Sequence, residues 1–266
     1  MNKILIALLL MFSSAAWAGD AEDGLAALDK QDYVTALNKF KLAAVNGNAT
    51  AHMNLGNMYY KGLGIEKNDA EALRWYKLAA AQGIPQAQYN LAVMYTYGYG
   101  IETDYLEAVR LYKLAAAQGD AKAQDALGLL YSKGQGVTQD NAEAMRWYKL
   151  AAEQGNADAQ IALGFKYEKG QDVKLDNGEA VRWFKLAAAQ GNLLAQVKIG
   201  VKYYRGEGVE QDYIKAHMWW NLAGASGDGS GFKNRDIVAE KMTQQQIAEA
   251  QRLAKECKIK NFSNCD

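Results

Sequence analysis

The chain has 266 residues, half of them hydrophobic, and its 30 basic residues balance 30 acidic ones. This neutral balance gives no electrostatic basis for binding nucleic acid or an anionic membrane surface. The length allows one or two ordinary domains, but an internal repeat determines the organisation instead.

The first residues have the pattern of a secretory signal peptide. Lys3 precedes an apolar run from Ile4 to Phe12, and small residues lead to a cleavage point between Ala18 and Gly19. The run is shorter than the roughly 20 residues that span a bilayer. We therefore predict a signal peptide over 1–18 and a periplasmic or secreted chain with no membrane span after cleavage; a retained anchor is the alternative.

A short motif recurs through the rest of the chain. The sequence KLAAAQG occupies residues 77–83 and returns in identical or varied form. The glycines that close its copies lie 36 residues apart, at Gly47, Gly83, Gly119, Gly155, Gly191 and Gly227. We predict a half repeat over 19–48 and five full repeats over 49–227, stacked because one helical hairpin cannot bury its apolar face alone.

Each repeat begins with a predicted first helix. Leu55 and Tyr59 lie on one helical stripe, with a small residue between them that permits close approach of another helix. Paired glycines, Gly62 and Gly64 in the first repeat, are expected to end this helix and reverse the chain. Asp172 replaces the second glycine in the fourth repeat, where we expect it to adopt a left-handed conformation.

The second helix of each repeat opens with a capping pattern. Asn68 stands three residues before Glu71, which predicts that the two residues satisfy each other's backbone amides. The pairs are Asn68 and Glu71, Asp104 and Glu107, Asp140 and Glu143, and Asp176 and Glu179. The tryptophan column that follows is interpreted as packing between repeats. The alanines of KLAAAQG form a seam for the next repeat, and Gly83 ends the helix.

Residues 228–266 are predicted to form the cap that shields the last repeat. The stretch GDGSGFKNRD is expected to be a turn-rich connector, and Thr243 with Gln246 opens a helix through about Glu256.

The only cysteines are Cys257 and Cys265, close together near the end of the sequence. Export would place them where a disulfide persists. We expect a bond that pins the tail and contributes about 2 to 3 kcal/mol, with two free thiols as the alternative.

The repeated columns A-x-A-Q-x-x-L-G-x-x-Y-x-x-G-x-G, D-x-x-E-A and W-Y-K-L-A-A-x-Q-G resemble the Sel-1-like repeat, a relative of the tetratricopeptide repeat. The resemblance implies an all-α fold, a right-handed superhelix of antiparallel helix pairs that serves as a protein-binding scaffold. Exported bacterial members include adaptors, host-interaction factors and periplasmic immunity proteins against secreted toxins. The family pattern carries no catalytic set.

Helical geometry leaves one face of the first helices outside the predicted core, because residues two positions either side of the core leucine point away from it. We call this the first-helix face. A contiguous apolar stripe there, in the column of Val93, predicts a partner site; burial between neighbouring repeats is the alternative. The predicted partner-binding residues are Met53, Asn57, Tyr60, Tyr89, Val93, Tyr97, Leu129, Lys133, Ile161, Phe165, Lys169, Val197, Val201, Tyr204 and Arg205.

Signals for an enzyme are weak. His52 and His217, the only histidines, lie in different helices, and we expect structural roles for both, with no metal or cofactor. Ser230 and Lys233 match the S-x-x-K pattern of penicillin-recognising enzymes, but no K-T-G accompanies them. We therefore expect a noncatalytic scaffold, with a β-lactam- or cell-wall-interacting enzyme as the alternative.

Overall fold

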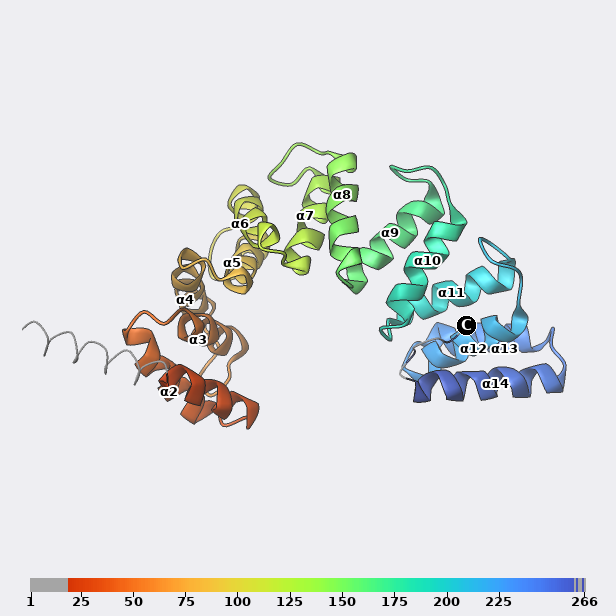
Figure 1. The fold of residues 1–266 in the computed structure, drawn as a ribbon, viewed down its shortest axis with the longest axis horizontal. Helices are drawn as coiled ribbons and strands as arrows, with labels where there is room; N and C mark the ends of the chain where they lie inside the picture. The colour runs from red at the N-terminus through yellow and green to blue at the C-terminus, as the bar shows by residue number, and fades with distance from the viewer. Residues whose placement is uncertain (1–18, 261, 263–264, 266) are drawn as a thin grey trace, which may run out of the picture. The chain divides into compact units, whose positions relative to one another are not determined.

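The computed structural model describes residues 19–260, 262 and 265, so the predicted signal peptide lies outside the described residues. Within these residues all regular secondary structure is helical, beginning with residues 19–29. The helices that follow are α2 (Tyr33–Val45), α3 (Ala49–Lys61), α4 (Asp69–Ala81), α5 (Pro85–Tyr97), α6 (Tyr105–Ala117), α7 (Ala121–Lys133), α8 (Asn141–Glu153), α9 (Ala157–Lys169), α10 (Asn177–Ala188), α11 (Leu193–Arg205), α12 (Tyr213–Ala225), α13 (Gly229–Ala239) and α14 (Gln244–Ile259) (Figure 1). The predicted all-α solenoid is confirmed.

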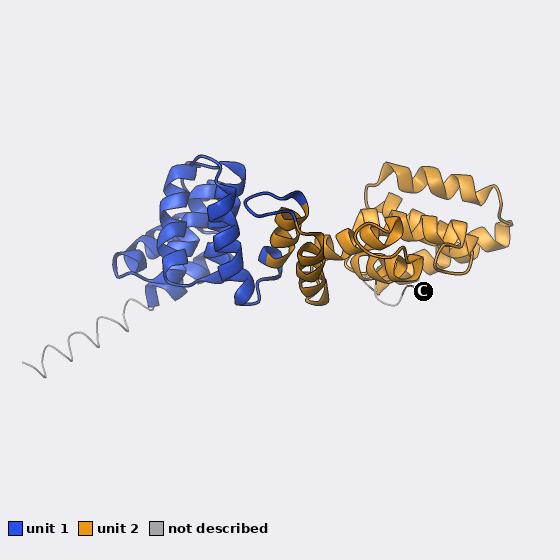
Figure 2. Ribbon diagram, turned by 90° about the horizontal axis from the view of Figure 1, so that it is seen from above, with its two compact units in different colours: residues 1–123, 133–139 blue, residues 124–132, 140–266 orange. Residues whose placement is uncertain are grey.

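The helices belong to two compact units (Figure 2). The first runs to residue 123 and includes residues 133–139, and the second holds residues 124–132 and 140 onward. Within the first unit α3 packs on α4 and α5 on α6, and within the second α9 packs on α10 and α11 on α12. No helix of the described residues is long and apolar enough to cross a membrane.

Aromatic side chains of the second helices pack directly on the backbone of the first helices. A Cβ added to Gly56 would lie 2.5 Å from the Tyr76 ring, so only a residue without a side chain fits there. The predicted close approach is confirmed, and the approaching group is this ring. The same pairing joins Gly128 to Tyr148, Gly164 to Phe184 and Gly200 to Trp220.

The turn between the two helices also fixes contacts between repeats. Gly100 has a positive φ of 67°, and a Cβ there would lie 2.6 Å from the carbonyl carbon of Asp69, at the start of the preceding second helix. Asp172, at the corresponding position of the fourth repeat, has a φ of 66° as expected. Its carboxylate accepts a hydrogen bond from the Lys166 ammonium at 2.5 Å.

The second helices are capped as predicted in one direction only. Oδ1 of Asn68 accepts from the backbone N–H of Glu71 at 3.0 Å. The predicted return bond is wrong, because the N–H of Asn68 donates to the Tyr59 carbonyl at 2.9 Å and Glu71 lies 3.5 Å from Arg74. The turn places the Tyr59 carbonyl, which has no partner within its own helix, beside the N–H of Asn68. Glu71 therefore pairs with Arg74 at the surface. Equivalent cap bonds form at Asp104, Asp140 and Asp176.

A ladder of side-chain amides joins the first and second helices of each repeat. Nε2 of Gln118 donates to Oε1 of Gln88 at 2.9 Å within the first unit. Two further glutamine pairs lie in the second unit, Gln154 with Gln124 and Gln190 with Gln160. The partner glutamines are buried, and a buried polar group must be hydrogen-bonded to avoid a desolvation cost. The ladder therefore supplies each buried glutamine with a partner inside its own repeat.

The tryptophan column is buried or half-buried, in keeping with the packing role expected for it. Trp183 and Trp219 are buried, and the guanidinium groups of Arg74, Arg146 and Arg182 lie 4.2 to 4.6 Å from the centroids of the tryptophan that follows each of them. Arginine stacking of this kind covers an aromatic face.

The predicted turn-rich connector is instead helix α13. Oδ1 of Asp228 accepts the backbone N–H groups of Ser230 and Gly231 and so starts the helix. A Cβ on Gly231 would lie 2.5 Å from the backbone nitrogen of Gly224. Of the glycines that suggested a loop, Gly231 is thus required where α13 crosses α12 closely.

The end of the cap follows the predictions. Thr243 and Gln246 form the reciprocal capping box of α14, which continues to Ile259. The Cys257–Cys265 disulfide is present. It holds Phe262 at a hollow of about 490 Å³ beside Trp219.

Candidate functional site

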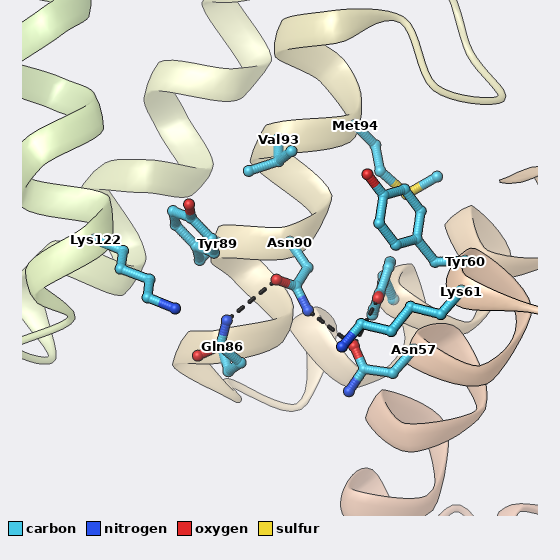
Figure 3. A pocket seen from close by; sticks show the side chains of 10 residues that line it. Asn57, Tyr60, Lys61, Gln86, Tyr89, Asn90, Val93, Met94 and Lys122 are labelled. Carbon is cyan, nitrogen blue, oxygen red and sulfur yellow. Dashed lines mark hydrogen bonds between the residues drawn. The ribbon is translucent and has the colours of Figure 1, made fainter. Parts of the chain in front are cut away.

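A pocket of about 400 Å³ lies on the first-helix face of the first unit, and we call it the α3–α5 pocket (Figure 3). It is lined by Asn57, Tyr60, Lys61, Tyr76, Gln86, Tyr89, Asn90, Val93, Met94 and Lys122. Predicted partner-binding residues meet here from two successive repeats: Asn57, Tyr60, Tyr89 and Val93. Sequence reasoning did not assign Gln86 and Asn90 of α5, Lys122 of α7 or Tyr76 of the second helix α4 to this face.

Side-chain amides form a connected chain along one side of the pocket. Nε2 of Gln86 donates to Oδ1 of Asn90 at 3.1 Å, and Nδ2 of Asn90 donates to Oδ1 of Asn57 at 3.2 Å. The Tyr76 hydroxyl donates to the same Asn57 oxygen at 2.7 Å. Burial raises the pKa of Tyr76 well above its usual value, so the hydroxyl keeps its proton. The network fixes which atoms of each amide remain available.

The charged groups of the pocket have one sign. Lys61 and Lys122 are exposed, and in Figure 3 their ammonium ends extend from opposite sides toward the Gln86 and Asn90 amides. Neither lysine forms a salt bridge with any described residue, and no carboxylate lines the pocket. The tyrosines and Val93 supply an apolar surface next to these cations, so the pocket combines free positive charge with aromatic area.

None of the residues in the central predicted column is buried. Leu129 is 39% exposed, and Asn57, Val93, Phe165 and Val201 are half-buried. Of the other predicted residues, Tyr97, Lys133, Lys169 and Arg205 are exposed, and Met53, Tyr60, Tyr89, Ile161, Val197 and Tyr204 are half-buried.

The first-helix face of the second unit is more apolar than the α3–α5 pocket. Phe165 packs edge-on against Phe184, with 5.4 Å between the ring centroids, and the Lys198 ammonium lies 4.6 Å from the Phe165 centroid. Val197 and Val201 pack against the hydrophobic core of this unit. These positions therefore support the fold as well as contributing to the surface.

The terminal cap covers one end of this face. The Lys241 ammonium donates to the Tyr204 hydroxyl at 2.6 Å and lies 4.7 Å from the centre of the same ring. Tyr204 was predicted as a partner-binding residue, but its hydroxyl and ring are engaged by the segment between α13 and α14.

Asp125 is a half-buried carboxylate on the first-helix face of the second unit. Burial raises its pKa to about 6, and the negative charge of Asp158 adds to the shift. The nearby Tyr148 hydroxyl has its pKa raised to about 12, chiefly by burial. Among the described residues no lysine or arginine forms a salt bridge with this half-buried carboxylate.

Lys166 and Lys202 of the second unit occupy the core position that Met58 and Met94 hold in the first two repeats. Lys202 is 1% exposed and forms salt bridges with Glu168 at 3.0 Å and Glu207 at 2.9 Å. Burial raises the pKa of Glu168, but hydrogen bonds from Lys198 and Lys202 outweigh it and leave the pKa below its usual value. Lys166 pairs with Asp172 in the same way.

Both histidines lie in the interior. His52 accepts a hydrogen bond from Gln82 at Nδ1 and contacts the Ala44 carbonyl through Nε2. His217 is buried in α12, and burial lowers its pKa. The described residues contain no group of three or more histidine, cysteine or acidic residues placed to hold a metal ion.

Ser230 and Lys233 lie in α13, and both are exposed. The Ser230 hydroxyl donates to Asp228 at 2.5 Å, the residue that caps the helix. The S-x-x-K match therefore falls on a helix start, where the serine is bonded to the capping aspartate.

The Sel1 repeat model matches residues 49–84, 85–120, 121–156, 157–192 and 193–228, which is more than half of the chain. The chain belongs to the Sel1 repeat family. Sel1 repeat proteins act as protein-interaction scaffolds, and their fold is generally non-enzymatic. No match was found among curated proteins.

Solved Sel1 repeat structures are similar to this chain. A Sel1 repeat protein from Oxalobacter formigenes is 32% identical with a TM-score of 0.77, over 89% of this chain and 99% of that one. A protective antigen of uropathogenic Escherichia coli strains, with an SLR fold, is 28% identical with a TM-score of 0.51, over 94% and 70%. An immunity protein from Pseudomonas aeruginosa is 23% identical with a TM-score of 0.51, over 80% and 81%, which shows the fold alone.

Proposed function

We propose that this chain is an exported, noncatalytic scaffold that binds a partner protein through its first-helix face, with the α3–α5 pocket at the centre of the contact. One observation carries the proposal: predicted face residues from successive repeats converge on a pocket of about 400 Å³ that joins aromatic side chains to unpaired lysines. Tyrosine is enriched at protein interfaces. A shaped pocket with such a lining supports recognition of another protein.

The test compares partner capture by matched variants. Tyr89→Ser together with Val93→Ser alters the pocket without touching a buried core leucine. Leu106→Ser removes an exposed leucine, 72% exposed, at the start of α6 and serves as the control. The pocket variant should lose partners that both the wild type and the control capture from periplasmic and culture-supernatant fractions, while all three keep the same helical circular dichroism. Equal capture by all three proteins would contradict the proposed face.

Export is part of the same proposal. The signal-peptide pattern of the sequence and the Cys257–Cys265 disulfide support it, because disulfides persist in oxidising compartments. Cell fractionation should place the chain outside the cytoplasm, and sequencing of its amino terminus should begin at Gly19. A cytoplasmic chain that starts at Met1 would refute this part and leave the binding face untouched.

The specific role that we propose within this class is periplasmic immunity, in which the scaffold neutralises a toxic effector. The α3–α5 pocket and the predicted signal peptide support this role. An adaptor or a host-interaction factor would use the same binding face. Cells that express a toxic effector encoded beside the gene should grow when they also express the wild type or Leu106→Ser. They should not grow when they express the pocket variant instead. Growth arrest with all three proteins would exclude immunity against that effector.

A further inference from the structure

The α3–α5 pocket has more free hydrogen-bond donors than acceptors. Oδ1 of Asn57 receives two hydrogen bonds, and Oδ1 of Asn90 receives one from Gln86. The Nδ2 group of Asn57 donates to no described residue. Together with the unpaired ammonium groups of Lys61 and Lys122, the pocket therefore presents donors and positive charge to whatever enters it.

We propose that this pocket binds an acidic side chain of the partner protein, with its carboxylate between the Lys61 and Lys122 ammonium groups. An aromatic or aliphatic neighbour of that acidic residue packs against Tyr60, Tyr89 and Val93. This inference rests on the proposed function of the first-helix face and adds the chemistry of the partner segment that this face selects.

The charges and shape of the pocket favour an acidic protein segment over a polyanion. Nucleic acid binding requires many basic contacts, whereas this pocket has two lysines on a chain whose charges balance. Phosphate recognition commonly uses the planar fork of arginine or a cradle of backbone N–H groups, and no arginine lines the pocket. Two lysines beside tyrosine rings suit one carboxylate next to an apolar side chain.

The test uses three labelled ten-residue peptides that differ at two positions. Each has a central phenylalanine, flanked by two glutamates, two glutamines or two lysines. Fluorescence anisotropy with the purified protein at low salt should show the glutamate peptide binding about tenfold more tightly than the glutamine peptide, because two exposed charge pairs each strengthen binding by a few fold. The lysine peptide should bind most weakly, and the preference should shrink as salt increases.

Variants locate the preference in the pocket. Lys61→Glu with Lys122→Glu should reverse it in favour of the lysine peptide. Lys41→Glu with Lys149→Glu makes the same charge change at exposed positions of second helices and should leave the preference for glutamate intact. Circular dichroism spectra should coincide for all proteins.

The outcomes separate this inference from the proposed function. Equal binding of the glutamate and glutamine peptides, lost in the Tyr89→Ser, Val93→Ser variant, would overturn the acidic preference and keep the binding face. A glutamate preference that survives reversal of Lys61 and Lys122 would overturn the assignment to this pocket. Absence of binding by all three peptides would also overturn the inference, and partner capture would then decide the proposed function alone.

Discussion

The side-chain amide of Gln82 donates a hydrogen bond to Nδ1 of His52 across a distance of 2.9 Å. The later repeats place glutamine against glutamine at the same positions, as with Gln118 and Gln88. The Nε2–H tautomer of His52 also donates to the Ala44 carbonyl at 3.2 Å. The imidazole thus performs both functions of the glutamine amide. Nδ1 accepts a hydrogen bond from Gln82, and Nε2–H donates one to the Ala44 carbonyl.

The His52 contacts predict an asymmetric response to substitution. His52→Gln should leave the free energy of unfolding within about 1 kcal/mol of the wild type, because glutamine restores the pairing seen elsewhere. His52→Leu should cost about 1 to 3 kcal/mol, since the Ala44 carbonyl loses its partner in a buried site. Urea unfolding followed by circular dichroism measures both; equal losses in the two variants would contradict the ladder.

The ladder ends at Gln196, whose Oε1 is buried and has no hydrogen-bond partner among the described residues. Ser226 occupies the place that glutamine takes in the earlier repeats, and its side chain is too short to reach. We expect Ser226→Gln to stabilise the chain by about 1 kcal/mol, the usual contribution of a completed hydrogen bond. Thermal melting checks this, and Gln196→Leu with Ser226→Gln is the control in which the gain should disappear.

Two glycines with the same backbone strain should respond differently to alanine. Gly100 and Gly119 both have positive φ, but a Cβ on Gly119 meets nothing within 4 Å. Gly119→Ala should therefore cost about 1 to 2 kcal/mol for the left-handed conformation alone. Gly100→Ala adds a collision with the backbone of Asp69 and should cost about 3 to 5 kcal/mol. Similar urea midpoints for the two variants would show that the turn does not fix the distance between repeats.

Asp125 predicts a stability that decreases as pH rises. Its pKa is about 6 in the folded chain, against a usual value of 3.8. The folded state therefore holds the proton more tightly, and stability is lost as pH rises from about 4 through 6. Asp125→Asn should stabilise the chain by about 1 to 2 kcal/mol at pH 7, a discounted figure because the side chain is half-buried, and should change little at pH 4.

Melting temperatures across this pH range, compared with the wild type, provide the measurement for Asp125. Asp158→Asn removes only the charge that adds to the pKa shift, so it should give a smaller gain over the same range. A gain for Asp125→Asn that is the same at pH 4 and pH 7 would assign the effect to packing instead.

The disulfide should stabilise the terminal cap locally. Reduction of Cys257–Cys265 frees Phe262 from the hollow beside Trp219, and a loop this short contributes about 2 to 3 kcal/mol. We expect a thiol reductant to lower the melting temperature by about 5 °C and to change tryptophan fluorescence. The double variant Cys257→Ala, Cys265→Ala should melt at the lower temperature and ignore the reductant.

Much of the fold follows from the repeat because each column of residues has one physical task. The predictions are wrong where two groups compete for one hydrogen-bond partner, or where a helix of the repeat pattern has an atypical sequence. The N–H of Asn68 donates to the Tyr59 carbonyl and not to Glu71. This contact depends on the turn and not on helix propensity. The sequence of helix α13 resembles a loop. Asp228, however, lies one repeat length after Asn192, the residue that caps α11. This spacing could have predicted the helix.

The candidate site is predictable in part. Angular position along the first helices indicates the face that holds Tyr89 and Val93, since it requires only the helical period. The pairing of Asn57 with Asn90 depends on how two repeats pack, so neither sequence position reveals it. The engagement of Tyr204 by Lys241 is equally hidden, because it joins residues far apart along the chain.

The buried lysines limit how such a protein can change in length during evolution. Lys202 relies on Glu168 in the preceding repeat, whereas Met58 and Met94 need only apolar neighbours. Duplication or loss of a unit among the early repeats would leave matching surfaces at the junction. Removal of the fourth repeat would take away Glu168 and leave the buried Lys202 with Glu207 alone, so a cut between these two modules costs more than one among the early repeats.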